Sequence, residues 1–521
     1  MEKTDKLLRK GRHIIALLIL IFISGLVIFF TYRMYANPVA AVHPKLSLMV
    51  KLMVPVACAG SIAAYILFIV LKTDKQKTLI VFALILAAII SVVIPPNSVS
   101  DEFTHFDTAY NYSNIILGLG GRNSNKQIYM RNCDLANVPF TVNSEKYVNS
   151  FGNFRIFASE EEQKLTAIQV VIVNTSPVYV YIPQIIGITA GRLLRLSGTL
   201  TYYIARFLNL GLYLILLYLA VKKMPFGKTA LAIIGIFPIS LQQAASMSSD
   251  AFINALAFLL TASVLSMIYS GREISAGEII AFLVMSVMLA PCKLVYFAIP
   301  FMALLIPKQN IKSKPLRLLT KIAVPILSVA ALIILEFRNL SVNLDNQTTG
   351  TAFSDTPTYS VYYIFTNTRD FIILMLRTLK ENVYYYMVST VSSPLGSLQI
   401  GISGAVFVIY VILTVMGLLP TAGKSERIHV GETQKLMSAA IFAGSSVLVI
   451  ISMLSAWTPN NSPVVLGVQG RYFLPLLPLI IPIAYTDKLS GKEIIERYAL
   501  FGAVSLGFYT AISALGTAVI Q

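Results

Sequence analysis

Residues 14–30 read IIALLILIFISGLVIFF, and none of these side chains carries a charge. A run of this length and composition crosses the hydrocarbon core of a bilayer as a helix. It is longer than the core of a signal peptide, and no small-residue cleavage pattern follows Phe30. We therefore expect a membrane anchor here.

The composition of the whole chain agrees with this first run. Of 521 residues, 56% are hydrophobic and 12% are charged, and the mean hydropathy is +0.73. Soluble domains carry about 25% charged residues, so a lipid bilayer is the expected surrounding of this chain. The net charge of +17 would suggest nucleic acid in a soluble protein. The basic residues lie in short loops between apolar runs, so we expect membrane topology and no nucleic-acid partner.

Apolar runs recur along the chain and predict an all-α, polytopic membrane protein of about thirteen spanning helices. The predicted spans are 14–31, 52–71, 78–94, 200–221, 228–245, 250–269, 275–290, 293–307, 318–336, 400–420, 436–455, 471–486 and 497–519. Several are shorter than the ~20 residues of a perpendicular span. We divide the chain into two accessory N-terminal helices (1–77), a membrane body (78–486) and a C-terminal helix (487–521).

Lysine and arginine residues predict the orientation, because short cytoplasmic loops carry an excess of them. With thirteen spans every basic cluster falls on one side, which places the N-terminus in the cytoplasm. Two long stretches, 95–199 and 337–399, then lie outside, and long loops of this kind are commonly functional. The segment 177–196 is apolar enough to span, but a span there would invert every later loop. We expect it to lie in the outer interface, with Arg192 and Arg195 at headgroup level.

The first long loop opens with ionisable residues, since residues 95–105 read PPNSVSDEFTH. On a helix, Asp101 and His105 would share one face, with Glu102 beside them. Such a group is a candidate for acid–base catalysis at the outer headgroup level. Helix capping by a serine, with carboxylates in the first turn, explains the same pattern.

A second motif opens the predicted span 471–486, since residues 467–475 read GVQGRYFLP. Arg471 would lie at the depth of Asp101. A guanidinium binds phosphodiester or pyrophosphate oxygens, and the glycines would let the backbone approach such a ligand. An arginine that snorkels to lipid headgroups explains the motif equally well.

A third motif is the polar outer turn at residues 242–250, QQAASMSSD. Asp250 either caps the following helix or faces a polar cavity. Arg206 and Lys293 are cations near the outer ends of spans. Ionisable residues at such depth are functional candidates, although an ion-pair partner elsewhere in the chain would also explain them.

Motifs of several other chemistries are missing. The chain has no phosphate-cradling glycine loop followed by Lys-Ser/Thr, no His-Glu-x-x-His and no Gly-x-Ser-x-Gly, which argues against ATP-driven transport and the familiar hydrolases. The spacing of its histidines and three cysteines predicts no zinc site. A divalent cation, Mg²⁺ or Mn²⁺, held by Asp101 and Glu102 with water and a diphosphate stays open.

Together the motifs resemble a known family. The patterns PP…DE-x-x-HF (95–106), S-x-S-x-D (246–250) and QGRYF-x-P (469–475) are similar to those of bacterial membrane proteins of domain-of-unknown-function family 2142, over roughly 78–486. That family is in turn similar to the GT-C glycosyltransferases, which carry an acidic pair in the first large extracytoplasmic loop. Those enzymes use a sugar on a polyprenyl phosphate as donor. One departure is residues 392–396, SSPLG, which lack the expected Gly-Trp pattern.

The resemblance implies a role for each site residue. Asp101 would be the general base, Glu102 would orient the acceptor or Asp101, and His105 would support this pair. Arg471, with Lys293, would neutralise the lipid phosphate as it leaves. The remaining candidates for substrate binding are Gln469, Tyr472, Arg206 and Asp250.

We therefore expect an inverting membrane glycosyltransferase of the bacterial cytoplasmic membrane, with its site on the extracytoplasmic side. The donor would be a polyprenyl-phosphate sugar, and the acceptor a cell-wall polysaccharide, a teichoic acid or a glycolipid. The alternative is a transporter or flippase of lipid-linked sugars, which needs polar residues deep inside spans, and few are present. A non-catalytic assembly or receptor protein is the third hypothesis.

Overall fold

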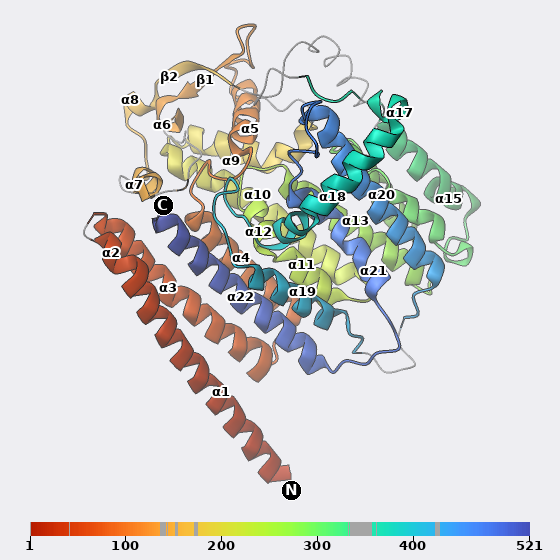
Figure 1. Cartoon of the computed structure of the whole chain (residues 1–521), viewed down its shortest axis with the longest axis horizontal. Coiled ribbons are helices and arrows are strands. Elements are labelled where there is room, and N and C mark those ends of the chain that lie inside the picture. The colour runs from red at the N-terminus through yellow and green to blue at the C-terminus, as the bar shows by residue number, and fades with distance from the viewer. Residues whose placement is uncertain are drawn as a thin grey trace.

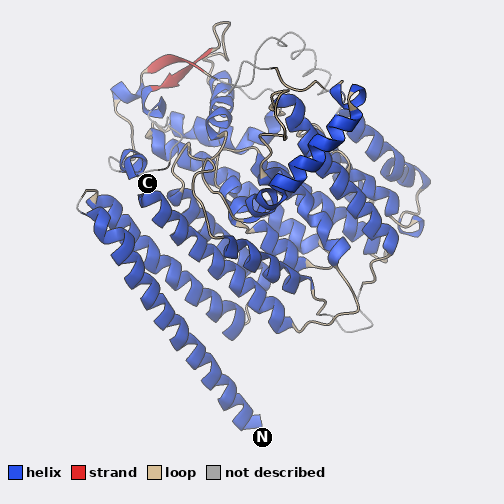
Figure 2. Ribbon diagram, viewed as in Figure 1, coloured by secondary structure: helices blue, strands red, loops and turns tan. Residues whose placement is uncertain are grey.

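The computed structural model describes residues 2–40, 42–135, 142, 144–151, 155–170, 176–331, 333, 357–360, 362–421 and 428–520. Within these residues the chain is almost entirely helical, with one two-stranded sheet (Figures 1 and 2). Residues 337–356 and 361 of the second predicted long loop lie outside the described residues. So do residues 332 and 334–336 of the predicted span 318–336. The prediction of an all-α membrane protein is confirmed.

Among the described residues, seven helices are long and apolar enough to cross a membrane. Helices form in such runs because lipid offers no hydrogen bonds, so each backbone group must find its partner within the segment. Each of the seven coincides with a predicted span, which confirms a multi-pass membrane protein. They are α1 (Glu2–Thr31), α3 (Pro44–Tyr65), α4 (Lys75–Val93), α10 (Gly198–Lys223), α13 (Asp250–Tyr269), α20 (Glu432–Ala456) and α22 (Glu493–Ile520).

Five of the other predicted spans are shorter or interrupted and the sixth, 318–336, is only partly described, so the count of thirteen is not confirmed. Apolar helices of 10–17 residues occupy three of them, namely α14 (Ala276–Leu289), α19 (Gly404–Leu418) and Gly470–Ala484, which joins the 3-10 segment η9 (Gly470–Leu479) to α21 (Ile480–Ala484). The predicted span 228–245 divides into α11 (Lys228–Gly235) and α12 (Pro238–Ala244). Pro238 lacks the backbone N–H that a continuous helix would use there. The span 293–307 forms two 3-10 segments, η4 (Leu294–Tyr296) and η5 (Ile299–Leu305).

The predicted first long loop folds into a layer of short elements at one end of the bundle (Figure 1). Its strands β1 (Gln127–Arg131) and β2 (Leu165–Gln169) are antiparallel, with Gln127 opposite Gln169. A buried ion pair of Arg131 and Asp134 (2.7 Å), to which Tyr110 donates a hydrogen bond (2.8 Å), joins the sheet to α5. The helices of this layer are α5 (Glu102–Ile116), α6 (Asn132–Leu135), α7 (Ser144–Phe151), α8 (Glu160–Gln163) and α9 (Ile182–Leu193).

The predicted interfacial segment 177–196 contains α9, whose 12 residues are too few to cross a bilayer. Arg192 does not extend toward headgroups as expected. It is 8% exposed, donates to Ser113 Oγ (2.9 Å) and lies over the ring of Tyr110. The guanidinium is therefore part of the packing inside the first-loop layer.

Two glycines four residues apart bring α9 against α10. A Cβ at Gly187 would collide with the backbone of Ala205, and one at Gly191 with the side chain of Thr201. Small residues at this spacing let two helices approach closely, which is a common basis of packing in lipid. The contact positions the first turns of α10, which carry Arg206.

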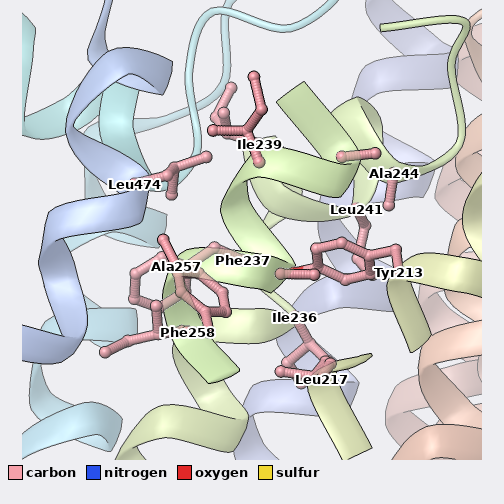
Figure 3. Close-up of a cluster of buried hydrophobic side chains, with 14 of the residues drawn as sticks. Tyr213, Leu217, Ile236, Phe237, Ile239, Leu241, Ala244, Ala257, Phe258 and Leu474 are labelled. Atoms are coloured by element: carbon pink, nitrogen blue, oxygen red, sulfur yellow. The ribbon is translucent and has the colours of Figure 1, made fainter. Parts of the chain in front are cut away.

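Helix α13 forms the centre of the bundle, since 94% of its most apolar window is buried. Its neighbours include α10, α12 and α14. Figure 3 shows this core, where side chains of α13 meet those of α10, of residues 236–244 and of η9. The labelled residues are Tyr213, Leu217, Ile236, Phe237, Ile239, Leu241, Ala244, Ala257, Phe258 and Leu474.

The N-terminal helices form a side layer, α1 with α3, at the edge of the bundle (Figure 1). Only 6% of the apolar window of α1 is buried, whereas α3 packs along α22. The Phe508 ring lies directly over Gly60. Arg497 donates to the carbonyls of Phe68 (3.3 Å) and Thr73 (2.9 Å). The second of the two predicted accessory helices thus contacts the C-terminal helix.

The α9–α10 contact yields a test by substitution. Gly187→Ala should lower the free energy of unfolding by about 1–3 kcal/mol, because the methyl group overpacks a backbone contact. Alanine otherwise favours a helix over glycine. The matched control is Gly277→Ala in α14, where no atom lies within 4 Å of an added Cβ. Thermal unfolding of both variants in detergent measures the effect, and equal melting temperatures would contradict this packing.

Candidate functional site

The site begins where the chain leaves α4 and turns into α5. Asn97 and Asp101 have φ angles of 62° and 61°, in the left-handed region that few non-glycine residues occupy. Asp101 takes the N-cap position of α5, but its side chain makes no capping hydrogen bond. The side chain is instead 52% exposed. Capping therefore does not explain this carboxylate.

Glu102 is completely buried, and both of its carboxylate oxygens are occupied. The donors are the backbone amides of Ser98 (3.1 Å), Val99 (3.2 Å) and Met247 (3.0 Å), and Nε (2.9 Å) and Nη2 (2.7 Å) of Arg206. A carboxylate with this many partners has no free position for an acceptor or a metal ion. Of the predicted roles of Glu102, which were to orient the acceptor or Asp101 or to bind a metal, these contacts favour the positioning of Asp101. Glu102 holds the loop from which Asp101 projects.

Arg206 closes the C-terminal end of α4. It is 1% exposed, and besides its pair with Glu102 it donates to the carbonyls of Ser91 (3.2 Å), Ile94 (2.8 Å) and Pro95 (3.0 Å). The last carbonyls of a helix lack partners within it, and a guanidinium can supply several donors at once. The predicted substrate contact of Arg206 is therefore corrected: the arginine is the buried partner of Glu102.

Arg471 meets Asp101 directly, although the two lie 370 positions apart in the sequence. Nη2 of Arg471 pairs with Oδ2 of Asp101, and Nη1 donates to the carbonyl of Ser100 (3.0 Å). Arg471 is 5% exposed, so it does not snorkel to the headgroups. The structure thus brings the acidic motif and the Gly-Arg-Tyr motif into one site.

The glycine before Arg471 fixes this position. A Cβ at Gly470 would collide with the backbone of Ser389 and Thr390, at the end of α18 (Thr368–Val391). The amide of Gly470 donates to Ser389 Oγ (3.1 Å), and Thr390 Oγ1 donates to the carbonyl of Gly470 (3.0 Å). Only glycine permits such an approach of two backbones.

Asp250 and Lys293 extend the ion pair. Asp250 is 5% exposed, and its carboxylate lies 2.6 Å from Lys293 Nζ and 3.8 Å from Arg471 Nε. Tyr472 stands between the two cations, with Lys293 4.7 Å and Arg471 5.3 Å from the centre of its ring. Asp101, Arg471, Asp250 and Lys293 thus form a chain of alternating charge, which we call the charge quartet. It favours the polar-cluster interpretation of Asp250 over simple capping.

A small pocket of about 10 Å³ lies beside Arg471. Ser100, Gln242, Gln243 and Gln469 contribute polar groups to its lining. Gln243 is 1% exposed, and within the described ranges its Oε1 has no hydrogen-bond partner, nor has Arg471 Nε. Amide and guanidinium groups without partners beside a pocket are suited to hydroxyl or anionic oxygens of a ligand.

His105 lies in the site but contacts neither carboxylate by a recorded hydrogen bond. Its Nδ1 is 2.8 Å from the hydroxyl of Tyr181, and the residue is 9% exposed. Burial lowers the pKa of His105 to about 4, and the nearby cations act in the same direction while the nearby carboxylates oppose it. The imidazole is therefore neutral at pH 7.

The two acidic residues do not form a joint metal site. Glu102 is taken by Arg206 and Asp101 by Arg471. Among the described residues no group of three His, Cys, Asp or Glu side chains could hold a metal ion. These residues do not fit the predicted divalent cation.

Three contributors to the site were missed from the sequence. Tyr181 holds His105, Tyr296 donates to the carbonyl of Tyr472 (2.8 Å), and Ser389 holds Gly470. None of them stands in a recognisable motif. Tyrosines near the ends of apolar runs look like interfacial anchors, so no local signal could have identified Tyr181 or Tyr296.

Removal of one partner of the buried pair should be costly. Glu102→Gln leaves Arg206 charged, buried and without its carboxylate, which should destabilise the fold by about 3–5 kcal/mol. Thermal unfolding in detergent tests this, with Glu145→Gln on the exposed side of α7 as the matched control. An unchanged melting temperature for Glu102→Gln would contradict the assigned role.

The buried histidine predicts a dependence of stability on pH. The pKa of His105 is about 4 in the folded protein and 6.5 when unperturbed. Between pH 7 and pH 5 the unfolded chain therefore takes up a proton that the folded chain does not, and stability falls by about 2 kcal/mol. His105→Asn should lose this component, which thermal unfolding at both pH values measures. His43→Gln, outside the site, should keep the wild-type slope, and an equal slope in His105→Asn would refute the assignment.

Comparison with known proteins identifies the family of the chain. A scan against protein families matches residues 84–480 to DUF2142, described as a predicted membrane protein. A search of curated proteins gave no match, and a search of solved structures gave none. The matched region holds Asp101, Asp250 and Arg471 and leaves out α1, α3 and α22. Since it covers more than half of the sequence, the chain belongs to the DUF2142 family of predicted membrane proteins.

Proposed function

We propose that this chain is a membrane glycosyltransferase of GT-C type. It would transfer a sugar from a polyprenyl-phosphate donor to an acceptor hydroxyl outside the cytoplasm. The observation that carries the proposal is the contact of Asp101 with Arg471, a candidate base beside a candidate phosphate ligand. The proposed donor and acceptor classes come from the resemblance to GT-C enzymes.

Asp101 is suited to the role of general base. Its side chain is half exposed, and Oδ2 faces Arg471. Oδ1 has no recorded hydrogen bond among the residues described. An acceptor hydroxyl can therefore reach this oxygen from solvent, in the geometry that proton transfer requires.

Arg471 and Lys293 supply a cationic cradle for the phosphate. Both flank the ring of Tyr472, and Lys293 is 30% exposed. The charges of the quartet cancel when no ligand is bound. A phosphate that takes over Arg471 displaces Asp101, so donor binding itself would free the carboxylate for the acceptor.

The chemistry follows from this arrangement. The acceptor oxygen attacks the anomeric carbon from the side opposite the phosphate, its proton passes to Asp101, and the bond from the carbon to the phosphate oxygen breaks. The sugar is transferred with inversion, and polyprenyl phosphate leaves on the cationic cradle. The three glutamines that line the small pocket beside Arg471 can bind hydroxyls of the sugar.

The proposed side of the membrane follows from charge. The quartet lies at the C-terminal end of α4 and the N-terminal end of α13. Lys75 and the basic run from Lys222 to Lys228 lie at the other ends of α4 and α10. Basic loops face the cytoplasm, so the quartet would face outward, at the plane of the lipid phosphates.

The test is a transfer assay with the purified full chain in proteoliposomes. Labelled monosaccharides on undecaprenyl phosphate are supplied as a panel with an envelope extract as acceptor, and release of undecaprenyl phosphate is measured. Asp101→Asn should lower the rate by about 10²–10⁴-fold, because the base is lost while the shape remains. Arg471→Lys should also slow transfer, by about 10²-fold, because lysine cannot reproduce the fork of donors.

Glu145→Gln removes an exposed carboxylate of the same loop and should transfer at the wild-type rate. Full activity of folded Asp101→Asn would remove Asp101 as the base. Movement of the labelled lipid across the bilayer without exchange of the glycosidic bond would replace the proposal by a flippase.

A further inference from the structure

A second and larger pocket, of about 260 Å³, lies at the end of the bundle opposite the charge quartet. It forms between the N-terminal ends of α4, α11 and α22 and the C-terminal end of α19. Its lining includes Lys75, Phe226, Lys228, Thr229, Tyr485 and Glu496.

The N-terminus of α11 opens into this pocket. Gly227 is its N-cap residue and provides no side-chain cap. No hydrogen bond is recorded for the amides of Lys228 and Thr229 within the described ranges. Such amides, with the positive end of the helix dipole, attract anions.

Thr229 provides the second and independent observation. The residue is 5% exposed, and in the part of the chain that the structure describes its hydroxyl has no hydrogen-bond partner. Threonines inside helices usually donate to a carbonyl one turn earlier. Thr414 does so here, with Tyr410 (2.8 Å). A hydroxyl of a buried residue that has no protein partner and lines a pocket is available to a ligand.

The charges of the pocket favour an anion. Lys75 forms an ion pair with Glu496, so these two cancel. Lys228 is exposed and has no ion-pair partner among the described residues. One positive charge therefore remains beside the free amides and the hydroxyl of α11.

We propose that this pocket binds the phosphate group of a phosphate ester. The amides of Lys228 and Thr229 and the hydroxyl of Thr229 contact its oxygens, and the Lys228 ammonium balances its charge. Glycine, lysine and threonine at a helix start serve the same chemistry at the end of a P-loop, although the earlier glycine of that motif is missing here.

The rest of the pocket sets the size of the ligand. Its volume exceeds that of a phosphate ion, and the rings of Phe226 and Tyr485 pack together in its wall, with centroids 4.5 Å apart. A phosphate with an organic substituent suits both parts. The headgroup of an anionic phospholipid and a soluble phosphate ester share this chemistry.

The experiment uses the full chain and two probes. Glycerol 3-phosphate is titrated calorimetrically into the detergent-purified protein. Native mass spectrometry then counts phosphatidylglycerol and phosphatidylcholine retained from mixed nanodiscs. Thr229→Val and Lys228→Ala should each weaken binding of the responding probe about tenfold. Thr229→Ser, which keeps the hydroxyl, should bind like the wild type, and so should Lys222→Ala, a nearby lysine outside the pocket.

Each outcome decides the proposal. Binding of glycerol 3-phosphate supports a soluble ester, and selective retention of phosphatidylglycerol supports a lipid headgroup. Failure of the wild type to bind either probe overturns the site, as does equal binding by Thr229→Val and Lys228→Ala. If Thr229→Val does not fold, the comparison of Lys228→Ala with Lys222→Ala decides alone.

Discussion

The buried pair of Glu102 and Arg206 is the constraint on which the site depends. Arg206 binds the last carbonyls of α4, while Glu102 binds the amides of the loop that follows and of the turn before α13. One ion pair thus joins the junction between α4 and α5 to α10 and to the turn before α13, which are distant from it in the sequence. A buried pair of this kind gains little stability over a well-packed apolar replacement. Its contribution is geometric, because it directs Asp101 out of the loop toward Arg471.

The ionisable groups differ in how completely their neighbours satisfy them. In the buried pair, every donor of Arg206 and both carboxylate oxygens of Glu102 form hydrogen bonds within the protein, and neither side chain contacts solvent appreciably. The quartet is less complete, since Asp101 is half exposed, Lys293 is 30% exposed and Arg471 Nε has no hydrogen-bond partner within the described residues. Groups that are fully paired maintain the structure, whereas groups with spare capacity can meet a ligand. This difference separates Glu102 from Asp101, although they are neighbours in the chain.

Much of the fold could be predicted because membrane spans are local features of composition. Seven long apolar runs became long helices, and the two motifs that carry Asp101 and Arg471 were expected at one depth. The division of α11 from α12 was not predicted, since residues 228–245 were expected to form one span. The roles of Glu102 and Arg206 could not be separated from those of Asp101 and Arg471. The burial of Glu102 depends on its partner Arg206, which lies 104 positions away, so a local sequence pattern cannot predict it. The Gly187–Gly191 spacing was visible in the sequence and could have predicted the α9–α10 contact.

The side layer of α1 and α3 has a consequence for how this protein is assembled. In water an apolar face must be covered, but in a bilayer the acyl chains are as apolar as the helix they touch. The face of α22 that carries Phe508 packs against Gly60 of α3, and the same face could contact lipid at little cost in free energy. Two contacts hold α3 against α22. The ring of Phe508 packs against Gly60, and Arg497 donates hydrogen bonds to the carbonyls of Phe68 and Thr73 beyond the end of α3. The layer of α1 and α3 is therefore held to the bundle by close packing and by the hydrogen bonds of Arg497. The hydrophobic effect contributes little to this attachment.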